Sequence, residues 1–210
     1  MNRSVHIVDY GIGNLLSVAR AVEKAGGEPR LTRDPAEIAS AERLLLPGVG
    51  AFEACMRTLG EYGLVESVTA FAASGRPFLG ICVGMQMMFD YSLEFGRHTG
   101  LGIVPGHVTA IPSKGRKVPH IGWSELDLPT GRSDWQGTLL ADAAPGVAAA
   151  YFLHSFECIP RHAVDRLADA DYGGHAVCAA IQRGNVIGFQ CHPEKSGPTG
   201  LRIIRRFIES

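Results

Sequence analysis

The sequence predicts an α/β fold: an open, mostly parallel and twisted sheet with flanking helices, extended by antiparallel hairpins in the second half. Residues 1–90 alternate short apolar runs with segments of helical periodicity, a pattern typical of parallel strands joined by helices. Later segments are short β-branched runs separated by turns. Glycine is unusually frequent, at 26 of 210 residues, so sharp turns are expected where strands end.

Each predicted element of the first half has a local signal. Short apolar runs indicate buried strands, and apolar residues at helical spacing indicate amphipathic helices. Gly26-Gly27 ends the first helix, and Pro47-Gly48-Val49-Gly50 ends the third strand. The predicted strands are 5–9, a short run before residue 31, 43–46 and 78–81, and the predicted helices are 15–25, 52–59, 65–73 and 85–89.

The second half is predicted to add strands and a closing helix. Hairpins are expected over 102–127, where Pro, Gly and β-branched residues alternate without helical period. Further strands are expected over 149–156, 164–170, 175–182 and 186–191, and a helix over 199–208. No linker or repeat interrupts the chain, and its length suits one large domain, so residues 1–210 are expected to form a single domain.

Composition and charge exclude several classes of function. The formal net charge is −1, so no global positive field favours nucleic acid or an anionic membrane. No apolar run reaches the roughly 18 residues of a spanning helix. The first strand follows Met1-Asn2-Arg3-Ser4 directly, which leaves no room for a signal peptide. We therefore expect a cytoplasmic protein with no nucleic-acid and no membrane partner.

The cysteines predict free thiols in a reducing compartment. They are odd in number, irregularly spaced and without a CxxC pair: Cys55, Cys82, Cys158, Cys178 and Cys191. Most are expected to be small buried side chains. His154 and Cys158 have the spacing of metal ligands on a helix, but their segment is predicted to be a strand, so no metal site is expected.

The strongest chemical signal is Gly80-Ile81-Cys82-Val83-Gly84, at a predicted strand-to-helix junction. A nucleophile between two glycines at such a junction is typical of a nucleophile elbow. The following helix directs amides and its positive dipole end at the thiol, which favours the thiolate. The Val83 amide can donate to a developing oxyanion. A buried thiol in an ordinary turn is the alternative.

His192-Pro193-Glu194 supplies a candidate base and orienting acid. Residues two apart in an extended segment project to the same side, so Glu194 can orient His192, which can activate Cys82. A turn with a solvated glutamate is the alternative.

Two glycine-rich turns follow predicted strands. Pro47–Gly50 stands at the carboxyl end of a predicted parallel strand, where open α/β sheets bind ligands, and it can supply a second oxyanion donor. Gly11-Ile12-Gly13-Asn14 lacks the third glycine of GxGxxG and the GK[ST] of a phosphate loop, so it is weak evidence for a nucleotide site.

Taken together, Gly80–Gln86 and His192–Glu194 resemble the motifs of the class I, triad-type glutamine amidotransferases. Within that family, blocks from residue 9 to residue 196 resemble the glutaminase subunits of imidazole glycerol phosphate synthases. The chain departs from that pattern at Ser124, Phe156 and Cys191, where Asn, Tyr and an aromatic residue are usual. The blocks are Asp9–Leu15, Leu46–Phe52, Pro119–Trp123, Tyr151–Ser155 and Gln190–Ser196.

The resemblance implies a flavodoxin-like sheet and the hydrolysis of L-glutamine to L-glutamate and ammonia. It implies that Cys82 attacks the side-chain amide, that His192 transfers the protons and that Glu194 fixes the His192 tautomer. No metal or organic cofactor is implied. The residues implied for the oxyanion hole and the substrate are Gly48, Val49, Gly50, Val83 and Gln86.

The resemblance also implies a heterodimer with a cyclase subunit, a (β/α)8 barrel that receives the ammonia. That partner forms imidazole glycerol phosphate and an aminoimidazole carboxamide ribonucleotide in histidine biosynthesis. The alternatives are a glutaminase that serves anthranilate or pyridoxal phosphate formation, a non-catalytic scaffold and a thiol hydrolase of the same fold. The residues expected to face the barrel are Asn14, Ser17, Arg20, Trp123, Tyr151 and Lys195.

Overall fold

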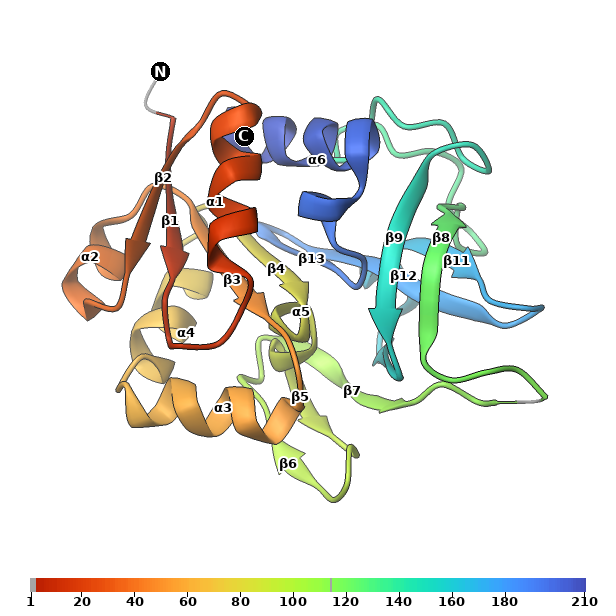
Figure 1. Cartoon of the computed structure of the whole chain (residues 1–210), viewed down its shortest axis with the longest axis horizontal. Coiled ribbons are helices and arrows are strands. Elements are labelled where there is room, and N and C mark those ends of the chain that lie inside the picture. Colours follow the sequence, from red (N-terminus) through yellow and green to blue (C-terminus); the bar gives the residue numbers. More distant parts are fainter. Residues whose placement is uncertain (1–2, 114) are drawn as a thin grey trace.

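A seven-stranded sheet forms the centre of the computed structural model, which describes residues 3–113 and 115–210 (Figure 1). Its strand order is β11-β12-β13-β4-β3-β1-β2. The parallel strands are β1 (Ser4–Val8), β2 (Glu28–Thr32), β3 (Leu44–Gly48), β4 (Phe78–Cys82) and β13 (Val186–Phe189). Two antiparallel strands extend one edge, β12 (Ala176–Arg183) and β11 (Arg166–Asp171). The predicted α/β class is therefore confirmed.

Helices cover both faces of this sheet. On one face α1 packs beside α6, and on the other α2 packs beside α4 (Figure 1). Local signals set their starts: Asp34 accepts a hydrogen bond from the Ala36 amide at 2.8 Å and precedes Pro35 at the first helical position. The helices are α1 (Leu15–Lys24), α2 (Pro35–Ser40), α3 (Phe52–Glu61), α4 (Val65–Ala73) and α6 (Gly197–Glu209).

The remaining strands form two smaller sheets. A four-stranded sheet has the order β10-β7-β5-β6, with β5 at Phe89–Ser92, β6 at His98–Thr99, β7 at Val104–Ala110 and β10 at Phe156–Pro160. The other sheet is an antiparallel pair of β8 (His120–Glu125) and β9 (Ala149–His154). This β8–β9 pair stands at the α6 side of the central sheet (Figure 1).

The structure corrects three boundaries and pairings. The helix predicted over 85–89 is α5 (Val83–Met87), and Phe89 opens β5 because it is buried and pairs with Val104. The strand predicted over 149–156 is divided at Ser155 into β9 and β10. The strands within 102–127 do not pair with each other, since β7 pairs with β5 and β10, and β8 pairs with β9.

The strands that carry the site are buried on both faces. Every residue of β3 and β4 is buried, which explains their continuous apolar runs. Within the described residues, no helix is long and apolar enough to cross a bilayer.

Candidate active site

Cys82 is the last residue of β4 and precedes the first residue of α5. Its backbone has φ 55° and ψ −114°, a conformation that non-glycine residues rarely adopt. The side chain is 3% exposed and lines a cavity of about 340 Å³. The predicted elbow is therefore present as a strained turn that places the thiol at a cavity wall.

The glycines beside Cys82 serve close packing. A Cβ on Gly84 would lie 2.0 Å from the Leu46 carbonyl oxygen, and one on Gly80 would lie 2.8 Å from the Met85 amide nitrogen. A Cβ on Gly48 would lie 2.5 Å from the Gly84 nitrogen. The sequence pattern predicts that the glycines make the sharp turn, but the positive φ belongs to Cys82, and the glycines let β3, β4 and α5 approach.

His192 and Glu194 follow β13, the neighbour of β4 in the sheet. His192 and Cys82 line the same cavity, and His192 Nδ1 lies 2.8 Å from Glu194 Oε1. Burial lowers the pKa of His192, but the interactions with Cys82 and Glu194 outweigh burial and raise it to about 9. The structure thus brings the three predicted residues together.

The geometry of the acid differs from the extended segment expected. Pro193–Lys195 is a 3-10 helix, so the Glu194 carboxylate reaches His192 within a tight turn. The Glu194 side chain is 2% exposed. Its second oxygen, Oε2, is buried without a hydrogen-bond partner in the described part of the chain. Glu194 is therefore buried against the imidazole, and a solvated glutamate is excluded.

The turn after β3 approaches the same cavity. Val49, Gly50 and Val83 line it, whereas Gly48 lies behind it, packed against Gly84. Gly50 has φ +86°, and a Cβ there would meet no atom within 4 Å, so its backbone conformation rather than a lack of space favours glycine. The Val49 carbonyl accepts a hydrogen bond from Cys55 Sγ at 3.4 Å.

Gln86 is buried at the cavity wall, and its side-chain nitrogen is bonded to two acceptors. Its Nε2 donates to the Phe156 carbonyl at 3.1 Å and to Gln190 Oε1 at 3.0 Å. Gln190 Nε2 in turn lies 3.7 Å from Cys82 Sγ. These contacts place a carboxamide side chain beside the nucleophile.

Glu94 and Phe95 also line the cavity, although no sequence motif singles them out. The Glu94 side chain is buried, and its Oε2 accepts a hydrogen bond from the Phe52 amide at 2.6 Å. Phe95 is 90% exposed with φ 51°, and its ring packs edge-on against Phe156 at the mouth. A lone acid next to an aromatic residue is the weak signal that could have pointed to this pair.

The sequence matches a known protein family over nearly its whole length. The sequence pattern of the family described as glutamine amidotransferase class-I matches residues 6–210. The chain belongs to this family. The resemblance noted in the sequence motifs is therefore confirmed.

Two curated relatives match this amidotransferase over nearly all of both chains. Imidazole glycerol phosphate synthase subunit HisH 1 of Legionella pneumophila (strain Lens) is 49% identical over 211 residues, 98% of this chain and 99% of the relative. The imidazole glycerol phosphate synthase subunit HisH of Syntrophotalea carbinolica is 46% identical over 207 residues, which are 96% of this chain and 97% of that relative. The solved structure of PurLQS from Thermotoga maritima has a TM-score of 0.73 at 20% identity, covering 100% of this chain and 98% of that one, which supports the fold.

The six residues expected at a partner interface form two adjoining groups on this amidotransferase. Asn14 caps α1 by accepting from the Ser17 amide at 3.4 Å, and Ser17 lines a hollow with Arg20, Glu194 and Gly197. Trp123 is 57% exposed and packs edge-on against Tyr151, while Lys195 is at the cavity mouth. A Cβ on Gly197 would lie 3.9 Å from Trp123 Cη2, so the groups meet there.

The other four cysteines of the amidotransferase are buried and do not line the cavity. Burial raises the pKa of Cys55 to about 11 and that of Cys178 to about 12, and it also raises the pKa of Cys158 and Cys191. All five cysteines are free. Within the described residues, no group of three or more His, Cys, Asp or Glu side chains could hold a metal.

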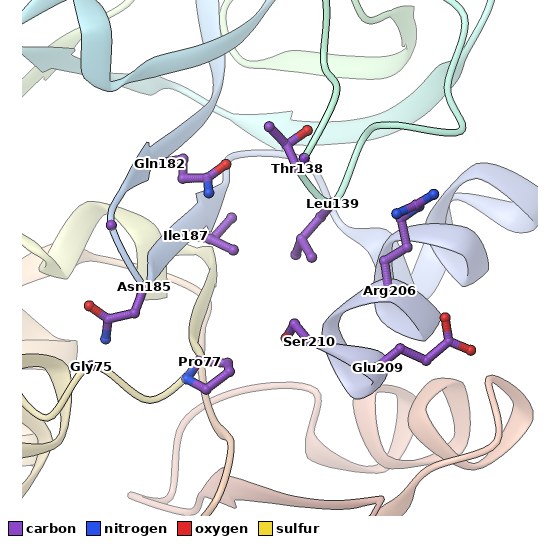
Figure 2. Close-up of a pocket in the computed structure, with 12 residues that line it drawn as sticks. Gly75, Pro77, Thr138, Leu139, Gln182, Asn185, Ile187, Arg206, Glu209 and Ser210 are labelled. Carbon is purple, nitrogen blue, oxygen red and sulfur yellow. The ribbon is translucent and has the colours of Figure 1, made fainter. Parts of the chain in front are cut away.

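A larger hollow of about 690 Å³ lies at the amino ends of β4 and β13, the edge of the sheet opposite Cys82. Figure 2 shows Arg206 and Glu209 on one side and Gln182 and Asn185 on the other. None of its lining residues is a cysteine or a histidine. The smaller cavity is therefore the one equipped for nucleophilic chemistry.

Proposed function

We propose that this chain is the glutaminase subunit of an imidazole glycerol phosphate synthase, which hydrolyses L-glutamine to L-glutamate and ammonia for histidine biosynthesis. One observation carries the proposal: Cys82 and His192 line one cavity, with Glu194 bonded to His192 behind it, in a chain 49% identical to a HisH subunit. We place the whole chain, residues 1–210, in one glutamine amidotransferase domain, and the protein in the cytoplasm.

The first half of the reaction transfers the γ-glutamyl group to Cys82. The thiol proton moves to His192, whose raised pKa of about 9 suits it to hold that proton at neutral pH. The sulfur attacks the amide carbon, and the oxyanion meets the amides of Gly50 and Val83, the latter lacking a partner within α5 because it is in the first turn. His192 then protonates the leaving ammonia, and a thioester remains.

The second half hydrolyses the thioester. Water gives a proton to His192 and attacks the thioester carbon, and the returning proton restores the Cys82 thiol as glutamate leaves. Glu194 holds the Nδ1 hydrogen of His192 throughout, so that Nε2 faces the sulfur.

Two buried polar side chains suit the recognition of glutamine. Gln86 stands beside Cys82, where its carboxamide can contact the substrate. Glu94 uses Oε2 for the Phe52 amide, which leaves Oε1 to pair with the α-ammonium group.

Ammonia released into water would be lost, so the cavity mouth requires a cover. We place there a cyclase subunit with a (β/α)8 barrel, in a heterodimer that passes the ammonia on. Lys195 lines the cavity, and Trp123 and Tyr151 pack edge-on beside Leu153, another lining residue. Asn14, Ser17 and Arg20 continue this face along α1. Exposed aromatic and Arg side chains are the anchors that such interfaces favour.

The test compares Cys82→Ala with the wild-type chain in the complex with the cyclase. The variant is expected to lose formation of imidazole glycerol phosphate from glutamine and to retain formation from added ammonium salt. Glutamine-dependent turnover by the variant would refute the proposal. We also expect the isolated chain to be a slow glutaminase that is activated when the cyclase and its nucleotide ligand bind. Glutamate release is therefore measured for the isolated chain, with cyclase, and with cyclase and its nucleotide ligand, and full activity of the isolated chain would refute this activation.

A further inference from the structure

Two buried histidines outside the triad, His120 and His154, face each other across the β8–β9 pair. They are register partners, and His120 Nδ1 lies 3.1 Å from His154 Nε2. Phe152 and Tyr172 stack on the His120 ring, with centroids at 4.8 and 4.1 Å. Burial lowers the pKa of His120 to about 4 and that of His154 to about 3, so both rings are neutral at pH 7.

The contacts of the two rings permit one arrangement of protons. His154 Nδ1 must carry a hydrogen, because its partner at 2.8 Å is the Phe156 carbonyl, which only accepts. His154 Nε2 therefore accepts from His120 Nδ1, and His120 Nε2 accepts from Ser124 Oγ at 2.9 Å. The hydrogen bonds run in one direction, from Ser124 to the Phe156 carbonyl.

The Phe156 carbonyl joins this chain of hydrogen bonds to the active site. It also accepts from Gln86 Nε2, whose other acceptor is Gln190 Oε1. Gln190 Nε2 completes the connection at 3.7 Å from Cys82 Sγ. Since hydrogen bonds in a buried network polarise and orient one another, the placement of the histidine pair bears on that of Gln86.

The other face of the same two strands is apolar and exposed. This β8–β9 outer face consists of the exposed Ile121, Trp123 and Leu153 and the half-buried Tyr151, where Ile121 pairs with Leu153 and Trp123 with Tyr151. Leu153 also lines the catalytic cavity, and its carbonyl lies 4.0 Å from Cys82 Sγ. Side chains alternate along a strand, so the residues that carry this face also fix the inward-pointing His120 and His154.

We propose that His120 and His154 are positioning residues that couple the seating of the partner subunit on the β8–β9 outer face to Gln86 and Cys82. The inference rests on the proposed function. In that function the cyclase covers the cavity mouth, and the β8–β9 outer face adjoins this mouth, so the cyclase would cover this face too. A shift of β8 against β9 changes the His120–His154 contact and passes to the Phe156 carbonyl. Because both rings are neutral, they transmit this shift without placing a second cation beside His192.

Two substitutions of His154 separate its hydrogen bond with His120 from its hydrogen bond with the Phe156 carbonyl. His154 also lines the catalytic cavity. His154→Asn retains a donor near the Nδ1 position and removes the acceptor for His120, so its glutamine KM should rise less than that of His154→Gln while activation by the cyclase falls about tenfold. His154→Gln retains an acceptor near the Nε2 position and removes the donor to Phe156. Its KM should rise about two- to tenfold, the range for one hydrogen bond. His107→Phe, which replaces a histidine stacked on Tyr91 in the four-stranded sheet, is the matched control and should change neither quantity.

A measurement on the wild-type chain keeps the inference testable if a variant does not fold. Nitrogen-15 NMR of the imidazoles at neutral pH should show both rings as neutral Nδ1–H tautomers, with a scalar coupling across the bond between His120 Nδ1 and His154 Nε2. An Nε2–H tautomer at either ring would overturn the arrangement. Folded variants with wild-type KM and activation would overturn the coupling, whereas a wild-type complex that releases no glutamate would instead refute the proposed function.

Discussion

Gly84→Ala probes the close packing that supports the nucleophile. The new Cβ would lie 2.0 Å from the Leu46 carbonyl oxygen and 2.9 Å from the Leu46 carbonyl carbon. Both are backbone atoms of a buried strand, so no side chain can rotate away and β3 and α5 must separate by about 1.4 Å to reach ordinary contact. Val83, whose amide faces the proposed oxyanion, lies directly before the substituted residue.

The expected cost is at the upper end of overpacking, about 3 kcal/mol. For a chain of this size that corresponds to a fall in melting temperature of about 6–12 °C. A displacement of about 1 Å at the oxyanion donor lowers kcat on the order of a hundredfold. Differential scanning calorimetry measures the melting temperature, and glutamate release by the complex with the cyclase measures kcat.

Gly60→Ala is the matched control. Gly60 is exposed within α3, and a Cβ there meets nothing within 4 Å, so alanine should stabilise the protein by about 0.5–1 kcal/mol without a change in kcat. If Gly84→Ala melts within a degree of the wild type and retains its kcat, the steric reasoning is wrong.

Three further predictions concern the site. His192, with its pKa raised from 6.5 to about 9, contributes stability that is fully present below about pH 6.5 and is lost as the pH rises through 9. Glu194→Gln lowers that pKa. The difference in free energy of unfolding between the wild type and this variant, measured in urea, should therefore be smaller at pH 9.5 than at pH 6, and a larger difference at pH 9.5 would contradict the prediction. Glu94→Gln should retain the Phe52 hydrogen bond and raise the glutamine KM about ten- to a hundredfold, and an unchanged KM would exclude recognition of the α-ammonium group. Gly50→Ala should cost about 1–2 kcal/mol and lower kcat, whereas Gly63→Ala, with φ +67° and equal free space, should show a similar cost with kcat unchanged.

Local patterns predicted the parallel part of the fold and the triad. The apolar runs of β3 and β4 are continuous because both faces of these strands are buried, and this property is visible along the sequence. Cys82 between two glycines and His192 before Pro193 are also local signals. The sequence does not indicate that β13 is the neighbour of β4, the pairing that brings Cys82 and His192 together.

Features that depend on distant pairings could not be predicted in the same way. Glu94 reaches the Phe52 amide, and His120 reaches His154, only after separate strands have assembled. Periodicity reports which face of a segment is buried, but it does not report which strand lies next to it. His154 therefore stood out as a possible metal ligand with Cys158, although the structure places it in a hydrogen-bonded chain with His120.

The burial of four thiols has a practical consequence for experiments on this protein. Cys55, Cys158, Cys178 and Cys191 are folded away with raised pKa values, while Cys82 faces a cavity. An alkylating reagent small enough for that cavity should attach once per native chain, although five thiols are present. The native protein then reacts as if it had a single thiol, and the amount of bound label gives the number of active sites in a preparation.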